Sequence, residues 1–228
     1  MQQVTTLTLF SFKTNKFWAF QQMGLAPFQL KDTEGLRFYK FLGTGGGQGF
    51  SLQPDFSTYA FLGVWESFSF YENCLQNHSI FKAYRNKATV QRDLVLKPIK
   101  SHGKWSGQNP FIPQTSTSNQ TDIKKAVVIT RATLHWNRLF SFWKSVPLAS
   151  KAIENAKGVQ YYKGIGEWPF IQQATISIWD NFEAVNTFAY KDKAHADIVK
   201  KTKQMKWYKE DLFSRFYLIS DTTKSLHS

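Results

Sequence analysis

The sequence contains one cysteine, Cys74, among 228 residues. A single thiol excludes a disulfide framework and the cysteine-rich zinc sites, and it favours a reducing compartment. The spacings His-x-x-x-His and Cys-x-x-Cys, which are typical of other zinc sites and of redox disulfides, are absent as well. The chemistry of this protein must therefore come from other residues or from a bound cofactor.

Long apolar runs are also missing. No segment approaches the ~18 residues that a membrane-spanning helix needs. The first residues lack the basic region, apolar core and small-residue cleavage site of a secretory signal. We therefore expect a cytoplasmic, water-soluble protein that contacts a membrane at most peripherally.

Aromatic side chains and positive charge are abundant. Aromatic residues make up 17% of the chain, with 21 Phe and eight Trp, and the net charge is +13. The aromatic excess suits either a large apolar ligand or two well-filled cores. The charge is compatible with nucleic acid, an anionic membrane surface or an acidic redox protein, and it does not choose among them.

The chain contains an internal repeat. Residues 35–43 (GLRFYKFLG) recur as residues 158–166 (GVQYYKGIG), and residues 64–68 (VWESF) recur as residues 178–182 (IWDNF). The offset between the copies shrinks because the first copy carries an extra loop at residues 44–49. Self-similarity of this kind indicates two structurally equivalent units.

Each copy is predicted to fold as strand, helix, strand, strand, helix, strand. The elements expected around the repeated segments are strands at 5–12, 59–65 and 95–99 with a helix at 16–26, and strands at 127–134, 173–179 and 216–220 with a helix at 138–154. Ser67 and Asn181 stand where the N-caps of the second helices belong. This order is that of the ferredoxin-like unit. The predicted fold class is therefore α+β, a tandem duplication whose two antiparallel sheets pack as a barrel with the helices outside.

The halves are joined by a polar segment. The predicted organisation is a first half at 1–100, a linker at 101–125, a second half at 126–221 and a tail at 222–228. The linker is rich in Ser, Thr, Gln and Asn. Trp105, Phe111 and Pro113 are expected to pack its first part against the body, and residues 114–121 are expected to be mobile. A ligand cavity is expected between one sheet and its own helices.

His195 is the leading candidate for an iron ligand. The first copy has Phe81 sixteen residues after Trp65, whereas the second has His195 sixteen residues after Trp179. The phenyl ring indicates that this position faces apolar material, and an imidazole there needs a partner, which can be a metal. The other interpretation is a structural histidine bonded to a backbone carbonyl.

Cys74 is the rival ligand, because thiolate-ligated haem favours oxygen activation. Its counterpart in the second copy is Phe188, and a buried cysteine commonly acts as a small hydrophobe. The remaining histidines are weaker candidates: His78 on an expected exposed helix face, His102 in the linker, His135 at a strand end where it could line a pocket mouth, and His227 in the tail.

Two arginines and two tryptophans complete the candidate site. Arg131 lies inside an expected strand, where a charge must face a cavity or be paired. It is a candidate to bind a haem propionate or to stabilise iron-bound oxygen, and a plain salt bridge is the alternative. Arg215 is a candidate for the same role at the start of the last strand. Trp179 and Trp207 are candidate cofactor contacts, with Tyr208 and Trp168 as further pocket walls; core packing is the alternative for each.

The glycine-rich segment 42–49 superficially resembles a phosphate-binding loop. It lacks the Lys-Ser/Thr pair of a P-loop and lies between two expected strands rather than before a helix. We therefore interpret it as a hairpin loop.

A series of motifs resembles the spheroidene monooxygenase family. They are residues 18–26 (WAFQQMGLA), 103–111 (GKWSGQNPF), 130–133 (TRAT), 164–167 (GIGE), 177–179 (SIW), 194–196 (AHA) and 207–216 (WYKEDLFSRF). The likeness spans nearly the whole chain. It departs from the family in the Ser/Thr/Gln-rich linker tip and the lysine-rich surface, which leaves the substrate open.

The resemblance implies a haem b protein with the fold of the dimeric α+β barrel oxygenases. It implies an enzyme that uses dioxygen and electrons from an acidic, ferredoxin-type donor to oxidise a carotenoid to a ketocarotenoid. Ligation by a second-helix histidine in related barrel proteins agrees with His195 as the metal ligand. Two alternatives stay open: a cofactor-free barrel monooxygenase acting on a phenolic or quinone-like compound, and a non-enzymatic binding module. No nucleic acid is expected, because the strands lack a ribonucleoprotein signature, and a homodimer is left open.

Overall fold

The computed structural model describes residues 3–47, 53–113, 125–168, 170–191, 200–202 and 204–226. The first half contains β1 (Val4–Ser11), α1 (Lys16–Gln29), β2 (Leu36–Gly45), β3 (Pro54–Trp65), α2 (Phe68–Asn77), α3 (Ser79–Lys87) and β4 (Val90–Gly103). The second half contains β5 (Ala126–Leu134), the 3₁₀ turn η1 (Trp136–Arg138), α4 (Leu139–Trp143), α5 (Val146–Glu154), β6 (Val159–Trp168), β7 (Gln172–Trp179), α6 (Phe182–Lys191) and β8 (Tyr208–Ser225).

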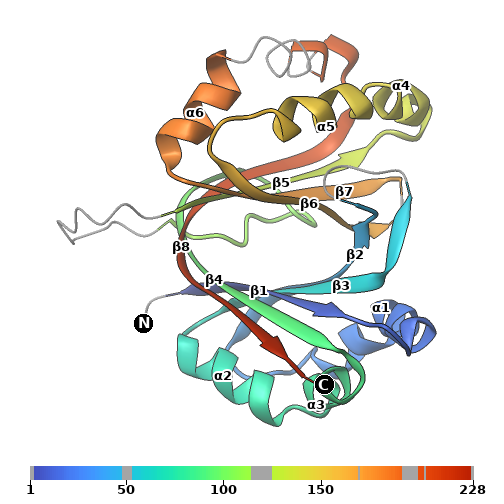
Figure 1. Ribbon diagram of the computed structural model, residues 1–228, viewed down its shortest axis with the longest axis vertical. Coiled ribbons are helices and arrows are strands. Elements are labelled where there is room, and N and C mark those ends of the chain that lie inside the picture. Colours follow the sequence, from blue (N-terminus) through green and yellow to red (C-terminus); the bar gives the residue numbers. More distant parts are fainter. Residues whose placement is uncertain are drawn as a thin grey trace, which may run out of the picture.

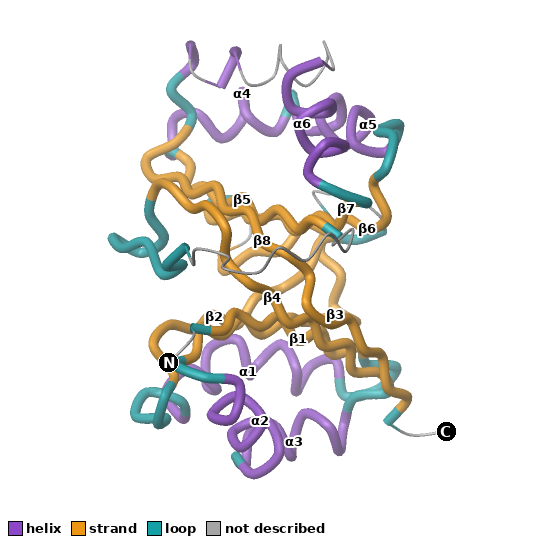
Figure 2. The backbone as a smooth tube through the Cα atoms, turned by 90° about the vertical axis from the view of Figure 1, so that its left-hand side faces the viewer, coloured by secondary structure: helices purple, strands orange, loops and turns teal. Residues whose placement is uncertain are grey.

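The strands form a closed antiparallel barrel in the order β1-β3-β2-β6-β7-β5-β8-β4. Helices α1 to α3 cover one side of the barrel and α4 to α6 cover the other (Figures 1 and 2). The duplicated α+β barrel with its helices outside is therefore confirmed.

The two halves share one barrel and are joined unequally. β8 is long enough to pair with β5 through its first part and with β4 through its second part. On the other side, β2 and β6 meet only at the pairs Gly43–Gly166 and Thr44–Ile165. The barrel is thus closed mainly by the length of β8.

Several boundaries differ from the sequence prediction. The helix expected at 138–154 is divided into η1, α4 and α5, and Pro147 lies at the start of α5, where a residue without an N–H donor is tolerated. β4 extends to Gly103, and β8 extends through Ser225, which pairs with Val90. Most of the predicted tail therefore belongs to a strand.

The helix caps agree with local sequence rules. Ser67 Oγ accepts a hydrogen bond from Phe70 N, and Asn181 Oδ1 accepts one from Ala184 N at 2.9 Å. His78 was expected on an exposed helix face, but it separates α2 from α3 and its Nδ1 accepts from Ile80 N at 3.3 Å. This histidine is therefore a capping residue.

The first part of the linker packs against the barrel as predicted. Trp105 and Phe111 are buried in the barrel core, whereas Pro113 is exposed, so its expected contact was wrong. Residues 114–121 lie outside the described residues. Residues 42–45 of the glycine-rich segment belong to β2, and residues 48 and 49 lie outside the described residues.

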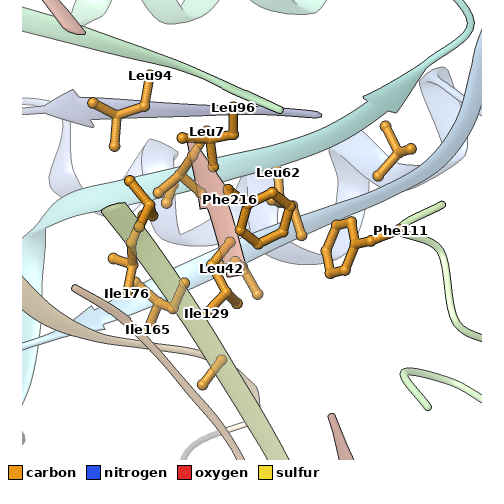
Figure 3. Packing of buried hydrophobic residues seen from close by; sticks show 14 of the residues in the cluster. Leu7, Leu42, Leu62, Leu94, Leu96, Phe111, Ile129, Ile165, Ile176 and Phe216 are labelled. Atoms are coloured by element: carbon orange, nitrogen blue, oxygen red, sulfur yellow. The ribbon is translucent and has the colours of Figure 1, made fainter. Parts of the chain in front are cut away.

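Buried side chains form three clusters. The barrel core contains leucine, isoleucine and phenylalanine side chains from both halves, as Figure 3 shows. The first sheet–helix layer lies between β1–β4 and α1–α3 and has 15 buried members. The second sheet–helix layer, between β5–β8 and α4–α6, has only five among the described residues. Within the described part of the chain, every helix falls short of the length and hydropathy that a bilayer crossing requires.

Candidate active site

Strand register makes the two halves comparable residue by residue. Trp65 and Trp179 each end the third strand of their half, and α2 and α6 begin three residues later in both cases. Thr8 pairs with Phe61 in the first half as Thr130 pairs with Thr175 in the second. Residues of the paired strands in the first half therefore have equivalents in the second.

The first sheet–helix layer is filled with aromatic rings. Phe10, Phe41, Tyr59 and Phe61 project from the sheet toward the helices, and all are buried. The Phe41 and Phe61 ring centroids are 5.1 Å apart, and those of Phe61 and Phe81 are 4.9 Å apart. No room for a ligand is expected among rings packed this closely.

The equivalent positions in the second half have lost these rings. Ala132 stands for Phe10, Gly164 for Phe41, Gln173 for Tyr59 and Thr175 for Phe61. Because each aromatic side chain buries about 150–250 Å², the four replacements remove much of the material between sheet and helices. We call Thr130, Ala132, Gly164, Gln173 and Thr175 the second-half floor.

The second-half floor is polar and accessible. The hydroxyl oxygens of Thr130 and Thr175 are 2.7 Å apart and share a hydrogen bond. Gly164 and Gln173 are also partly exposed, whereas the equivalent Phe41 and Tyr59 are buried. The floor can therefore accept a bulky group from the helix side of the sheet.

Aromatic residues border the floor at both ends. Trp179 is buried beside Phe188, with ring centroids 5.1 Å apart, and its indole N–H donates to Ser177 Oγ at 2.8 Å. At the other end the indole N–H of Trp207 donates to Ser141 Oγ at 3.1 Å. Trp179 and Trp207 are both buried, whereas Trp168 is 63% exposed and lies outside this arrangement.

Arg215 lies on the same face of the sheet as the floor. It pairs with Val128 in the neighbouring strand, and its guanidinium carbon is 5.4 Å from the centre of the Phe213 ring. Its Nε is buried and has no hydrogen-bond partner among the described residues. A buried donor without a partner is a suitable contact for an anionic group of a ligand.

His102 is a neighbour of this arginine that the sequence did not reveal. Its ring stacks on Phe213 at 5.3 Å, because β4 continues past the predicted end at residue 99 and brings His102 opposite Phe213. The sequence placed His102 in the linker, because the extension of β4 past residue 99 depends on its pairing with β8.

Arg131 does not face the floor. Its guanidinium lies on the barrel side of β5, forms an ion pair with Glu210, and approaches Glu167 at 3.6 Å. The equivalent position in the first half is Leu9, a barrel-core residue. Of the two interpretations of Arg131, the salt bridge is therefore the one that its geometry supports, and the predicted haem contact is not.

The charged cluster around Arg131 closes one end of the barrel. Lys40 Nζ donates to Glu167 Oε2 at 2.5 Å, and the Trp105 indole N–H donates to Glu167 Oε1 at 2.6 Å. The backbone N–H groups of Ser106 and Gly107 donate to Glu210 at 3.0 and 2.7 Å. These bonds fix the start of the linker on the barrel.

A cavity of about 250 Å³ is present elsewhere, in contact with Leu9, Arg92, Tyr161 and Lys163. Arg92 forms two hydrogen bonds to Asp221, at 2.8 and 2.7 Å, and Lys163 pairs with Asp55 at 3.4 Å. Both cations are therefore already neutralised, which distinguishes this cavity from the second-half floor.

The other candidate ligands occupy unfavourable places or undescribed ones. Burial raises the pKa of the Cys74 thiol to about 11, and this residue belongs to the filled first layer, which disfavours a thiolate ligand. His135 is exposed at the end of β5. His195 and His227 lie outside the described residues. Within the described ranges, no cluster of three or more His, Cys, Asp or Glu could hold a metal.

Comparison with known proteins gives the family and the fold. No family model matches the chain. The chain is 31% identical over 218 residues to the spheroidene monooxygenase of Rhodobacter capsulatus, covering 95% of this chain and 90% of that protein. It is 29% identical over 225 residues to the spheroidene monooxygenase of Cereibacter sphaeroides, covering 97% and 68%. A solved aldoxime dehydratase has a similar fold, with a TM-score of 0.64 at 10% identity over 97% of this chain and 84% of that one.

Proposed function

The chain belongs to the spheroidene monooxygenase family and is a monooxygenase, and from this premise we propose that it binds haem b and oxidises a carotenoid to a ketocarotenoid. The observation that carries the proposal is the loss of aromatic rings from the second sheet–helix layer. Four large side chains of the first half have become Ala132, Gly164, Gln173 and Thr175 in the second. A flat group of the size of haem requires a gap of this kind.

The proposed ligand follows from the same comparison. Phe61 packs on Phe81 in the first half, and the equivalent residues in the second half are Thr175 and His195. An imidazole thus replaces the ring that would face the floor. Imidazole is a common axial ligand of haem iron, so His195 is the proposed ligand.

The described residues fit such a group in three ways. The floor offers small and polar side chains instead of rings, and Trp179 and Trp207 border it as apolar walls. Arg215 offers a buried donor without a described partner, suited to a carboxylate such as a propionate. When bound, haem supplies the redox chemistry of oxygen activation, which these side chains cannot supply.

This chain's own residues have the roles of binding, orienting and excluding water. The rings of Trp179, Phe188 and Trp207 exclude solvent from both ends of the layer. The Thr130–Thr175 hydroxyl pair places a hydrogen-bonding group on the floor. His102, stacked beside Arg215 through Phe213, is an additional imidazole at the edge of the site.

The carotenoid substrate and the electron donor are proposed on chemical grounds. The names of the relatives contain a carotenoid, spheroidene, and a substrate of this class needs apolar walls. A net charge of +13 favours an acidic donor of the ferredoxin type. It also favours contact with an anionic membrane that holds the substrate.

The test is the visible spectrum of the purified protein after expression with a haem supply. We expect a Soret band, which His195→Ala removes and which added imidazole partly restores. His135→Ala is the matched control, because this exposed histidine lies at a strand end, and we expect its spectrum to equal that of the wild type.

Two results would contradict the proposal. A protein that oxidises substrate without bound iron would be a cofactor-free monooxygenase of the same barrel class, whose substrate would be sought among phenolic and quinone-like compounds. An unchanged spectrum in His195→Ala, combined with a lost spectrum in His102→Ala, would move the ligand to the edge of the floor.

A further inference from the structure

Helix α1 exposes four large apolar side chains and buries two alanines. Phe17 and Phe28 are 73% and 81% exposed, and Phe20 and Leu25 are at least half exposed. The residues that α1 buries are Ala19, Gln22 and Ala26. With 3.6 residues per turn, Phe17, Phe20 and Phe28 fall within about 80° of one another around the helix. This is the reverse of an ordinary surface helix, which turns its apolar stripe to the core.

The apolar face continues beyond the helix. The rings of Phe20 and Phe56 are 5.9 Å apart, and Phe56, at the start of β3, is also half exposed. Contiguous exposed apolar surface of this kind marks a site of interaction.

The second half repeats the feature. Phe140 in α4, the equivalent of Phe17 in the repeat, is 86% exposed, and Leu148 in α5, the equivalent of Leu25, is exposed as well. Trp136 is exposed immediately before α4. Figure 1 shows α1 and α4 on the same side of the molecule, at the right of the view. Both copies therefore carry exposed aromatic rings on helices that lie on this side.

The charge around these rings is mostly positive. Residues 1–31 and 123–153, which contain α1, α4 and all of α5 except its last residue, Glu154, have no Asp or Glu, although the chain has 16. Lys13, Lys16 and Lys31 are exposed around α1, and Arg138, Lys144 and Lys151 are exposed around α4 and α5. We use the name aromatic–basic face for the surface made of α1, Phe56, η1, α4 and α5. This face combines exposed apolar rings with cationic side chains.

We propose that the aromatic–basic face docks the protein on an anionic phospholipid bilayer. Phenylalanine and tryptophan rings insert at the boundary between headgroups and acyl chains, while lysine and arginine contact the anionic headgroups. This docking assigns particular residues to the membrane contact of the proposed function, and its purpose rests on that function. Helices α4 and α5 also cover the second sheet (Figure 1), so docking places the candidate site beside the apolar phase that dissolves a carotenoid.

A second copy of the chain fits this face less well. Lysine is depleted at protein–protein interfaces, and two copies that each carry a net charge of +13 repel one another. A lipid surface supplies both the apolar phase and the negative charge.

The test is flotation of the haem-loaded protein with vesicles that contain no carotenoid. We expect the wild type to bind vesicles of phosphatidylcholine mixed with phosphatidylglycerol, to bind phosphatidylcholine alone much more weakly, and to lose affinity as salt is raised. The double variant Phe17→Ser with Phe28→Ser should bind at least tenfold more weakly while its Soret band stays unchanged. The matched control is Ile112→Ser with Ile219→Ser, which removes two exposed apolar side chains elsewhere.

Three outcomes overturn the proposal. They are the absence of wild-type binding to the anionic vesicles, equal loss in the test and control variants, and a wild-type dimer that the test variant dissociates without any vesicle binding. The last result would assign the face to contact between copies. Because the vesicles are free of substrate, failed docking with a normal Soret band rejects only this inference, whereas normal docking without a Soret band rejects only the proposed haem.

Discussion

The rings of Phe61 and Phe81 pack with their centroids 4.9 Å apart in the first half of the chain. Counted along the repeat, the second-half positions that correspond to this pair are Thr175 and His195, of which His195 lies outside the described residues. One half thus provides an internal reference for the other: what is a filled core in the first half has become small and polar in the second.

Refilling the second layer should weaken cofactor binding. Thr175→Phe restores the ring that Phe61 supplies in the first half, and we expect haem affinity to fall at least tenfold, or about 1.4 kcal/mol, measured by Soret titration. The reciprocal change Phe61→Thr is the control. It should lower the free energy of unfolding by about 3–5 kcal/mol, as large-to-small core changes do, and leave haem affinity intact. Equal haem affinity of Thr175→Phe and wild type would reject the floor as the site.

Arg215 should contribute to ligand affinity more than to stability. Arg215→Leu removes a guanidinium whose Nε has no described partner, so few interactions of the fold are lost. We expect about 1.5–3 kcal/mol of haem affinity to disappear, the range of a hydrogen bond to a charged group. Arg37→Leu, which removes an exposed arginine paired with Glu66, should leave affinity unchanged. A large fall in the melting temperature with unaltered affinity would show a structural role instead.

Cys74 should be unreactive and dispensable for the cofactor. Burial raises the pKa of its thiol from 9.0 to about 11, which lowers the thiolate fraction at pH 8 roughly a hundredfold. A thiol reagent followed by absorbance should therefore modify the native protein far more slowly than the protein in urea. Cys74→Ala should keep the Soret band and lose about 0.5–3 kcal/mol of stability. Loss of the Soret band in this variant would restore the thiolate as a ligand candidate.

The charged cluster at the barrel end should make stability depend on acid pH. Burial would raise the pKa of Glu210, but the N–H groups of Gly107 and Ser106 and the guanidinium of Arg131 outweigh it and hold that pKa below its usual value of 4.5. The stabilisation contributed by ionised Glu210 is therefore complete above about pH 4.5. It is lost as the pH falls through the lowered pKa that Glu210 has in the folded protein.

Glu210→Gln tests this dependence. It should cost about 2–3 kcal/mol at neutral pH, less than the roughly 3–5 kcal/mol of a fully buried pair, because the Glu210 side chain is 23% exposed. Melting temperatures between pH 3 and 7 should fall less steeply in the variant than in the wild type. The exposed Glu34→Gln is the control, and a parallel fall in wild type and Glu210→Gln would remove Glu210 from the acid response.

Sequence alone determined what is local or repeated. The recurrence of residues 35–43 at 158–166 set the equivalence of the halves, and the N-caps at Ser67 and Asn181 followed from their own neighbours. The family also followed from sequence, through motifs spread over the chain. The equivalence of Phe81 and His195 follows from the repeat, whereas the ligand role of His195 is still a prediction.

Tertiary structure decided which face each side chain occupies. Arg131 lies in the strand that the sequence predicted, but only the pairing of β5 with β7 and β8 shows that it points into the barrel while Thr130 points to the helices. Pairing with the long strand β8 extends β4 past residue 99 and places His102 opposite Phe213. Such pairings join residues that are far apart in the chain. Local periodicity carries no information about them, because it shows only that one face of an element is apolar. It does not show which other element that face contacts.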